Sequence, residues 1–513
     1  MSKPRYLLIG CLIIVITMGL LSIFPVKGYD SLSIKYSTYL GGNGTEGWGF
    51  LHFDNSNNLI LISNTDSTDF QMKDAIQSTN AGERDAFCLK FDPNGENLLL
   101  ATLYGGSGDD FTSDAAVDSQ GNIIIAGTTT STDFPVRHAL EENKSSYGVD
   151  IFVFKLSPDG QNVVFSTLLG SGSNYHSIGV TTDSNDNIII TGSTIAPDFQ
   201  VKDAYQVNKS GGTDAFITKI TPDGQNVLFS TFFGGSANDQ IKRVTTDKSD
   251  NIIMIGVTSS SGDFPIKNAI QPNRSSSDWD VFLSKFSSDG QELIFSTFYG
   301  GSRPWGPAAV ICDSDDNILA VGETNSQEFP VRNAFQEDYG GGELDSFLTK
   351  LGPDGQEIFF STFIGGKGSE GPIGLTLNSK NNIFLTGSTN SYDFVSKNAF
   401  QAQNNGVWEG YLMEFSNNGQ DLLFSSFYGG SSNDYSTSVT LIPETNDSMF
   451  IAGHGSSRDL NLVSPYQESH GGGEFDLFLC RLEYISPQQT STTGFEMSVL
   501  LGFVIIFLAR KRK

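Results

Sequence analysis

The chain has 513 residues and a formal net charge of -27 at pH 7, because 58 acidic residues face 31 basic ones. So acidic a chain lacks the basic footprint of nucleic-acid-binding proteins. Aromatic residues are plentiful, with 39 Phe and 16 Tyr, so a large core is available. The four Cys have neither metal-site spacing nor the pattern of a disulfide framework.

Residues 1–28 have the pattern of a secretory signal peptide. Lys3 and Arg5 precede an apolar run over residues 6–24, and Gly28 offers a small residue at a cleavage point. The run is long enough for an uncleaved membrane anchor, which is the alternative. We expect the mature chain before residue 495 to lie outside the cell, with the basic C-terminal end on the cytoplasmic side.

One phrase recurs seven times along the chain. It is YSTYLGG at 36–42, FSTFYGG at 295–301 and FSSFYGG at 424–430, and the seven copies are spaced by 64 to 66 residues. A fixed period of this length is the signature of a repeat architecture, in which each copy is one supersecondary unit.

The unit over residues 105–168 shows the expected elements in order. A short strand around 114–117 is followed by a tight DSQGN turn and by the apolar run NIIIAGT, which is typical of a strand buried on both faces. A long polar loop, a third strand DIFVFKL, an SPDG turn and a fourth strand QNVVFSTLLG complete the unit. Asp-rich turns such as DSNDN at 183–187 lack the full set of calcium-loop ligands, so we interpret them as hairpin turns.

Four strands in each of seven units predict an all-β fold, a seven-bladed β-propeller with four antiparallel strands per blade, over residues 29–485. The last unit ends with the third strand DLFLCRL at 476–482, whereas the chain begins with a lone fourth strand, SIKYSTYL at 33–40. We therefore expect the N-terminal strand to complete the seventh blade, which closes the ring and leaves no exposed sheet edge.

The C-terminal region has two further parts. Residues 486–494 form a Ser/Thr-rich linker, and residues 495–513 are an apolar stretch with a basic end. This tail resembles the sorting tails of archaeal and bacterial surface proteins, although Thr493 stands where the archaeal motif has Pro. Plain transmembrane anchoring is the alternative. Hydrophobic helices are thus expected at both termini, with the protein anchored to the cell membrane or envelope.

The repeated units resemble SBBP repeats, which form seven-bladed β-propellers in secreted and surface proteins of bacteria and archaea. The YSTYLGG strand, "VDSQGNIIIAGTT", "STDFPV", the "DAF" strand and the PDG turn carry the resemblance, which covers about residues 33 to 484. The resemblance implies the fold and an extracellular location rather than an activity.

We define the loop face as the face that carries two kinds of connection. These are the long loops between second and third strands, and the turns from each fourth strand to the next blade. Long loops on a rigid scaffold commonly carry function. All four Trp fall in these connections, where exposed rings suit contacts with a glycan or a protein; the alternative is that they pack under their own loops. The candidate binding residues are Trp48, Trp279, Trp305 and Trp408, with Tyr175 in the third unit.

An acidic residue recurs five positions after the first glycine of the phrase. At the mouth of the central channel, these carboxylates would form a partial ring that attracts a cation such as Ca²⁺. The alternative is that each carboxylate caps the amides of its own turn. The five residues are Glu46, Asp110, Asp239, Glu370 and Asp434.

N-glycosylation sequons occupy the same loop in three successive units, 65 residues apart, at Asn143, Asn208 and Asn273, with another at Asn43. In a secreted protein we expect such sites to be exposed acceptors.

No catalytic motif stands out. The five His share no repeat position, and the chain has no GxSxG, HExxH or phosphate-binding loop. We therefore expect an extracellular, membrane-anchored propeller that acts as a binding or adhesion scaffold for a glycan or protein ligand. One alternative is a structural component of the envelope. Another is a secreted polysaccharide-acting hydrolase or lyase, which would need two acids in a deep pocket.

Overall fold

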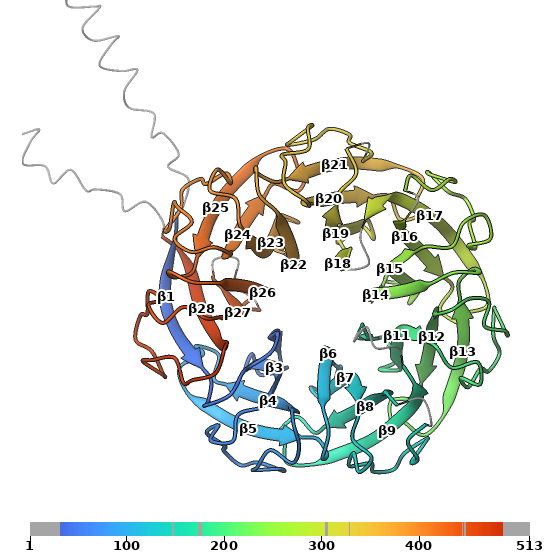
Figure 1. Ribbon diagram of the computed structural model, residues 1–513, viewed down its shortest axis with the longest axis horizontal. Coiled ribbons are helices and arrows are strands. Elements are labelled where there is room, and N and C mark those ends of the chain that lie inside the picture. Colours follow the sequence, from blue (N-terminus) through green and yellow to red (C-terminus); the bar gives the residue numbers. More distant parts are fainter. Residues whose placement is uncertain are drawn as a thin grey trace, which may run out of the picture. The chain divides into compact units, whose positions relative to one another are not determined.

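The computed structural model describes residues 31–145, 148–172, 177–276, 278–302, 306–327, 329–443, 445 and 448–485. Residues Ser33–Glu483 form one compact unit. In the described residues, 28 strands form seven four-stranded antiparallel sheets, as Figure 1 shows. This confirms the predicted seven-bladed propeller.

The expected terminal helices, in residues 1–28 and 495–513, lie outside the described residues and gain no support from the structure. Within the described residues, no helix combines the length and apolar character needed to span a membrane.

Each of the first six blades uses four consecutive strands, the first of which is innermost. The first blade contains β2 (Phe50–Phe53), β3 (Leu59–Thr65), β4 (Asp85–Phe91) and β5 (Leu98–Tyr104). The second contains β6 (Asp110–Val117), β7 (Ile123–Thr129), β8 (Asp150–Leu156) and β9 (Val163–Ser171). The third contains β10 (Gly179–Thr182), β11 (Ile188–Thr194), β12 (Asp214–Ile220) and β13 (Val227–Phe233).

The next three blades follow the same order. The fourth blade contains β14 (Asp239–Thr246), β15 (Ile252–Thr258), β16 (Trp279–Phe286) and β17 (Leu293–Ser302). The fifth contains β18 (Pro307–Cys312), β19 (Ile318–Thr324), β20 (Asp345–Leu351) and β21 (Ile358–Ile364). The sixth contains β22 (Glu370–Leu377), β23 (Ile383–Thr389), β24 (Glu409–Phe415) and β25 (Leu422–Tyr428).

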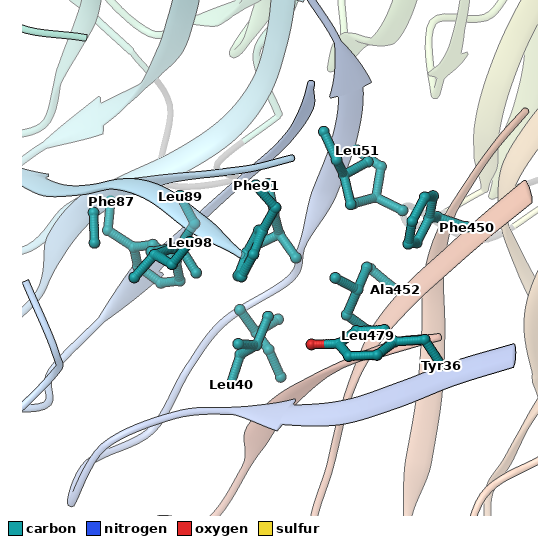
Figure 2. Close-up of a cluster of buried hydrophobic side chains, with 14 of the residues drawn as sticks. Tyr36, Leu40, Leu51, Phe87, Leu89, Phe91, Leu98, Phe450, Ala452 and Leu479 are labelled. Carbon is teal, nitrogen blue, oxygen red and sulfur yellow. The ribbon is translucent and has the colours of Figure 1, made fainter. Parts of the chain in front are cut away.

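The seventh blade combines both ends of the described chain. It contains β26 (Asp434–Leu441), β27 (Ser448–Gly455) and β28 (Asp476–Ile485), and β1 (Ser31–Leu40) pairs with β28 as its outer strand. In Figure 1 the blue β1 lies beside the red β28. Figure 2 shows Tyr36 and Leu40 of β1 packed near Leu479 of the seventh blade and Leu51 of the first. The predicted closure is therefore confirmed, and its apolar residues join the first and last blades in one core.

The core lies between neighbouring blades. All seven residues of β7 are buried, as expected for a run of three consecutive Ile that is covered on both faces. One cluster joins Ile217 and Phe233 of the third blade to Ile252 and Phe282 of the fourth. Because burying one such Phe contributes about 1.5–3 kcal/mol, the blades stabilise one another mainly through these aromatic faces.

The Asp-rich turns lie opposite the loop face, and the structure confirms that they are hairpin turns. Asp183 Oδ1 accepts hydrogen bonds from the backbone N–H groups of Asn185 and Asn187, each at 2.9 Å. Its Oδ2 lies 2.7 Å from Lys219 Nζ, which also donates to the Ser288 carbonyl of the next blade at 2.9 Å. The same buried ion pair recurs in four other blades, as Lys90–Asp54, Lys155–Asp118, Lys285–Asp247 and Lys350–Asp313.

Candidate ligand-binding site

The innermost strands enclose a cavity of about 430 Å³ at the loop-face end of the propeller axis. All seven blades line it, and Figure 1 shows β6, β14, β18, β22 and β26 around the centre of the ring. A second cavity of about 350 Å³ lies further along the axis. The two cavities share Phe50, Arg243, Ala308 and Ile373, so Arg243 lies where they meet.

Aromatic rings form a continuous row beside this cavity, which we call the axial pocket. Trp48 stacks on His454 with ring centroids 6.5 Å apart, and His454 stacks on Tyr435 at 5.2 Å. Tyr435 in turn lies 6.0 Å from Trp408. Trp48, Tyr435 and Trp408 line the pocket, and Trp48 is 47% exposed. The Trp48 ring is therefore open to solvent beside the pocket, whereas His454, in the middle of the row, is buried behind the lining rings.

A basic pair lies on the pocket wall. β14 carries a β-bulge between Ile241 and Arg243, with Lys242 as its extra residue, and both Lys242 and Arg243 line the pocket. A bulge re-aims side chains in this way because two residues then oppose one on the neighbouring strand.

Lys242 is buried, with 5% of its surface exposed. Its Nζ donates to Gln240 Oε1 at 2.8 Å and to Ser177 Oγ at 3.1 Å, so within the described residues it donates to neutral acceptors and to no carboxylate. Burial lowers the pKa of the Lys242 ammonium to about 7, and the nearby Arg243 charge acts in the same direction.

Arg243 is held at the junction of the two cavities. Its guanidinium lies 5.9 Å from the centroid of the Phe50 ring, and Nη1 donates to the Lys242 carbonyl at 2.8 Å. In the second cavity, burial raises the pKa of Asp114, and the Arg243 charge opposes that shift. The Phe50 ring and the Lys242 carbonyl thus position the planar guanidinium of Arg243, which lines the pocket.

Two acidic residues also line the axial pocket, Glu323 of β19 and Glu370 of β22. The Glu370 carboxylate is occupied by its own turn, because it accepts hydrogen bonds from Thr389 Oγ1 at 2.6 Å, Ser391 Oγ at 2.5 Å and the Gly366 N–H at 3.1 Å. Glu323 is the other acidic residue of the pocket wall.

The predicted Trp residues fall into different environments. Trp48 and Trp408 line the axial pocket, and their role in binding a ligand stays a prediction. Trp279 is the first residue of β16 and is 8% exposed, so it packs in the blade instead. Trp305 and Tyr175 lie outside the described residues.

The five predicted acids lie at five separate junctions between blades. Each is buried, with at most 1% of its surface exposed. Asp110 Oδ2, for example, accepts from the Gly106 N–H at 2.6 Å and from Ser131 Oγ at 2.9 Å, which is the turn-capping arrangement. Within the described residues, no group of three or more His, Cys, Asp or Glu is arranged to hold a metal ion.

A second acid from the preceding blade faces each of these five. A Cβ atom on Gly105 would lie 2.5 Å from Asp85 Oδ1 and 2.6 Å from Asp110 Oδ2, so the two carboxyls converge on a glycine. Burial is the main cause that raises the pKa of acids in all five pairs, for example to about 8 for Glu46 and to about 7 for Asp345. The pairs are Glu46–Asp476, Asp110–Asp85, Asp239–Asp214, Glu370–Asp345 and Asp434–Glu409.

Asn143, Asn208 and Asn273 are exposed in the long loops. The serine of each sequon binds an acid near the start of the third strand. The Ser210 N–H donates to Asp214 at 2.7 Å, and Ser275 Oγ donates to Asp280 at 2.8 Å. This loop closure accounts for the 65-residue spacing. The Asn43 side chain donates to Thr68 Oγ1 at 3.0 Å. Glycosylation of the four Asn stays a prediction.

Sequence reasoning missed the basic pair. The bulge position lies eight residues after the first glycine of each repeated phrase. Across the seven units it is Gly49, Ser113, Ile178, Lys242, Ala308, Ile373 and Thr437. Lys242 is the one charged residue at this position among small, apolar and hydroxyl ones, and this contrast is the sequence signal that marks the pocket.

Comparisons with known proteins agree with a propeller fold and go no further. No family model matches the chain. An uncharacterised WD-repeat-containing protein of Acanthamoeba polyphaga mimivirus is 24% identical over 372 residues, which covers 60% of this chain and 26% of the viral protein. The chain thus spans about a quarter of that relative's length. The SBBP assignment stays a resemblance.

Two solved structures are similar at low identity. A protein of unknown function from Dyadobacter fermentans has a TM-score of 0.43 at 9% identity, covering 89% of this chain and 100% of that one. An ulvan lyase, a polysaccharide lyase, has a TM-score of 0.44 at 11% identity, covering 83% of this chain and 92% of the lyase. Fold similarity at this level does not transfer an activity, so function is argued from the site.

Proposed function

We propose that this protein is an extracellular propeller, anchored to the cell membrane or envelope, that binds a glycan in the axial pocket of its loop face. The row of rings formed by Trp48, His454, Tyr435 and Trp408 is the observation that carries the proposal. The extracellular location and the anchor rest on the sequence patterns of residues 1–28 and 495–513.

The shape and chemistry of the pocket support a small ligand or the end of a chain. Ligand pockets of proteins are commonly about 300–1,000 Å³ and combine apolar walls with a few polar groups, and the axial pocket, at about 430 Å³, has both. Sugar rings have an apolar face that stacks on aromatic side chains, while their hydroxyls need polar partners. The exposed Trp48 ring supplies a stacking surface, and the polar residues of the pocket wall supply partners for the hydroxyls.

A glycan array probed with the full-length protein tests this function. We expect binding to a defined group of glycans, and Trp48→Ala should weaken it about tenfold because the stacking surface is lost. Tyr392→Ala is the matched control, since Tyr392 is a 76% exposed ring that does not line the pocket. Failure to bind any glycan, or equal weakening by both substitutions, would contradict the proposal.

One observation favours a second function, cleavage of a polysaccharide. The pKa of Lys242 near 7 would let a fraction of this amine act as a base inside the pocket at neutral pH. Incubation of the full-length protein with a panel of polysaccharides, followed by measurement of new chain ends, tests this function. Turnover that disappears in Lys242→Gln would support polysaccharide cleavage. Binding without turnover would support glycan binding as the function and contradict cleavage.

A further inference from the structure

We infer that the glycan bound in the axial pocket carries a carboxylate, and that Lys242 and Arg243 bind this group. The inference rests on the proposed glycan-binding function and names the ligand class. It starts from the position of the two cations, which are consecutive residues on β14 and yet both line the pocket because of the bulge at Lys242.

The hydrogen bonds of Lys242 leave room for an anion. An ammonium has three N–H donors, and the two that are used meet the neutral Gln240 and Ser177. A buried ammonium with neutral partners is costly, and a bound carboxylate would offset that cost. Gln240 Nε2 is also buried without a hydrogen-bond partner among the described residues, so a further donor lies in the same cluster.

Arg243 supplies the geometry that a carboxylate needs. One N–H of its guanidinium is used by the Lys242 carbonyl, and the Phe50 ring holds the group in place. A guanidinium can bind the two coplanar oxygens of a carboxylate as a fork. Because Glu323 lines the same pocket and would repel further negative charge, a singly charged carboxylate suits this wall better than a doubly charged phosphate.

The acidic part of the wall sets how such a sugar would lie. Glu323 lines the same pocket and would repel a carboxylate but accept hydrogen bonds from hydroxyl groups. Glu370 offers little to a ligand because its own turn holds its carboxylate. A uronic-acid-type sugar with its carboxylate toward β14 and hydroxyls toward β19 satisfies both walls. A neutral sugar would leave the two cations without an anion.

An array of matched glycans separates this inference from the proposed function. Each oligosaccharide is presented in neutral, carboxylated and sulfated form to the full-length protein. Binding that favours the carboxylated members supports the inference. Preference for neutral or sulfated members overturns it while the glycan-binding function stands. An array without any binding overturns the function itself.

Substitutions then test the two cations on the glycan that binds best. Lys242→Gln and Arg243→Gln should each weaken binding about tenfold or more, because a charged hydrogen bond is lost. Lys267→Gln is the matched control, since Lys267 is an exposed lysine on an outer loop. A thermal melt of each variant checks that the fold is intact. Equal affinity of Lys242→Gln and the unchanged protein would overturn the assignment of Lys242.

The pH dependence of glycan binding distinguishes direct binding by Lys242 from a purely structural role, because a structural role would not change it. The charged groups that face Lys242 are Arg243 and Glu323. Because the ammonium loses its proton near pH 7, binding should weaken as pH rises from 6 to 8. Lys242→Arg should restore binding and remove this pH dependence, since a guanidinium stays charged. A Lys242→Arg variant with the same pH profile would contradict the role of Lys242.

Discussion

Lys219 and Lys242 are both buried lysines, and they illustrate two kinds of position in this molecule. Lys219 of β12 is 6% exposed and pairs with Asp183 in an arrangement that recurs in five of the blades. Lys242 of β14 is 5% exposed, contacts neutral side chains and has no lysine at the equivalent position of any other unit. Burial alone therefore does not distinguish a structural residue from a binding one.

The difference follows from symmetry. Every blade must close its turn and attach to the next blade, so the residues that do this recur with the period of the repeat. A ligand on the axis meets all seven blades at once and is itself not seven-fold symmetric, so the residues that bind it break the repeat. In a repeat protein, recurrence indicates fold, and its interruption at a cavity indicates function.

The largest effect should come from breaking a recurrent pair. Lys219→Met removes the partner of Asp183, whose side chain is almost fully buried, and leaves an uncompensated carboxylate. We expect a loss of about 3–5 kcal/mol in the free energy of unfolding, measured by denaturant titration. Lys202→Met is the control, because Lys202 is an exposed lysine that donates to a carbonyl, and should change stability by less than about 0.5 kcal/mol. Similar losses in both variants would contradict the comparison.

The buried acid pairs should make stability fall toward alkaline pH. Burial raises the folded-state pKa of Glu409 and of Asp345 to about 7, well above the value near 4 of an unfolded chain. Between these two pKa values the folded protein holds protons that the unfolded chain has released. This contribution is therefore complete below about pH 4 and is lost as pH rises to the folded-state pKa near 7.

Turn acids such as Asp183 act in the opposite sense. Hydrogen bonds and the Lys219 charge lower the pKa of Asp183, so its contribution is lost as pH falls below about 4. Unfolding titrations should therefore give a higher free energy at pH 5 than at pH 8. Glu409→Gln should flatten this decline, whereas Glu96→Gln, at an exposed position, should not. A stability that rises from pH 5 to pH 8 would be inconsistent with protonated pairs.

A smaller effect is expected from a recurrent glutamine that the sequence analysis did not single out. Gln271 Oε1 accepts from the Gly300 N–H at 3.1 Å, and equivalent glutamines bind the turn glycine at five other blade junctions. Gln271→Ala should cost about 0.5–1.5 kcal/mol, the net value of one such hydrogen bond. Gln120→Ala, at an exposed hairpin turn, is the comparison in the same denaturant titration, and an equal cost there would show that Gln271 has no special role.

The sequence predicted the fold well because the repeat encodes it seven times. The fourth strand without a partner at 33–40 was enough to predict the closure by β1. The first strand was predicted too short, around 114–117, whereas β6 begins at Asp110. Its first four residues follow the Gly-rich turn and include a single apolar one, Phe111, so they carry little hydrophobic pattern. Their strand character comes from pairing with β7.

The site was predicted in part, for a physical reason. Trp48 and Trp408 were found because a large ring in a polar loop is conspicuous, but Trp279 shows that the same loop position can be buried when the strand starts one residue earlier. Whether Asp110 faces a channel or a neighbouring acid depends on how two blades meet. The bulge that exposes Lys242 to the pocket is likewise a property of strand pairing, which one unit's sequence does not reveal.

The smallest effect on stability is expected from Lys242→Met, and it contrasts most clearly with the large loss expected for Lys219→Met. Lys242→Met removes a buried ammonium that has no carboxylate partner among the described residues. Because the lowered pKa shows that burial disfavours the charged form, Met should leave the free energy of unfolding within about 1 kcal/mol of the unchanged protein or raise it. Denaturant titration beside Lys219→Met gives the test. An equal loss of unfolding free energy at positions 242 and 219 would mean that Lys242 stabilises the fold as Lys219 does. The stability data would then no longer support the inference that the Lys242 charge binds a ligand in the axial pocket.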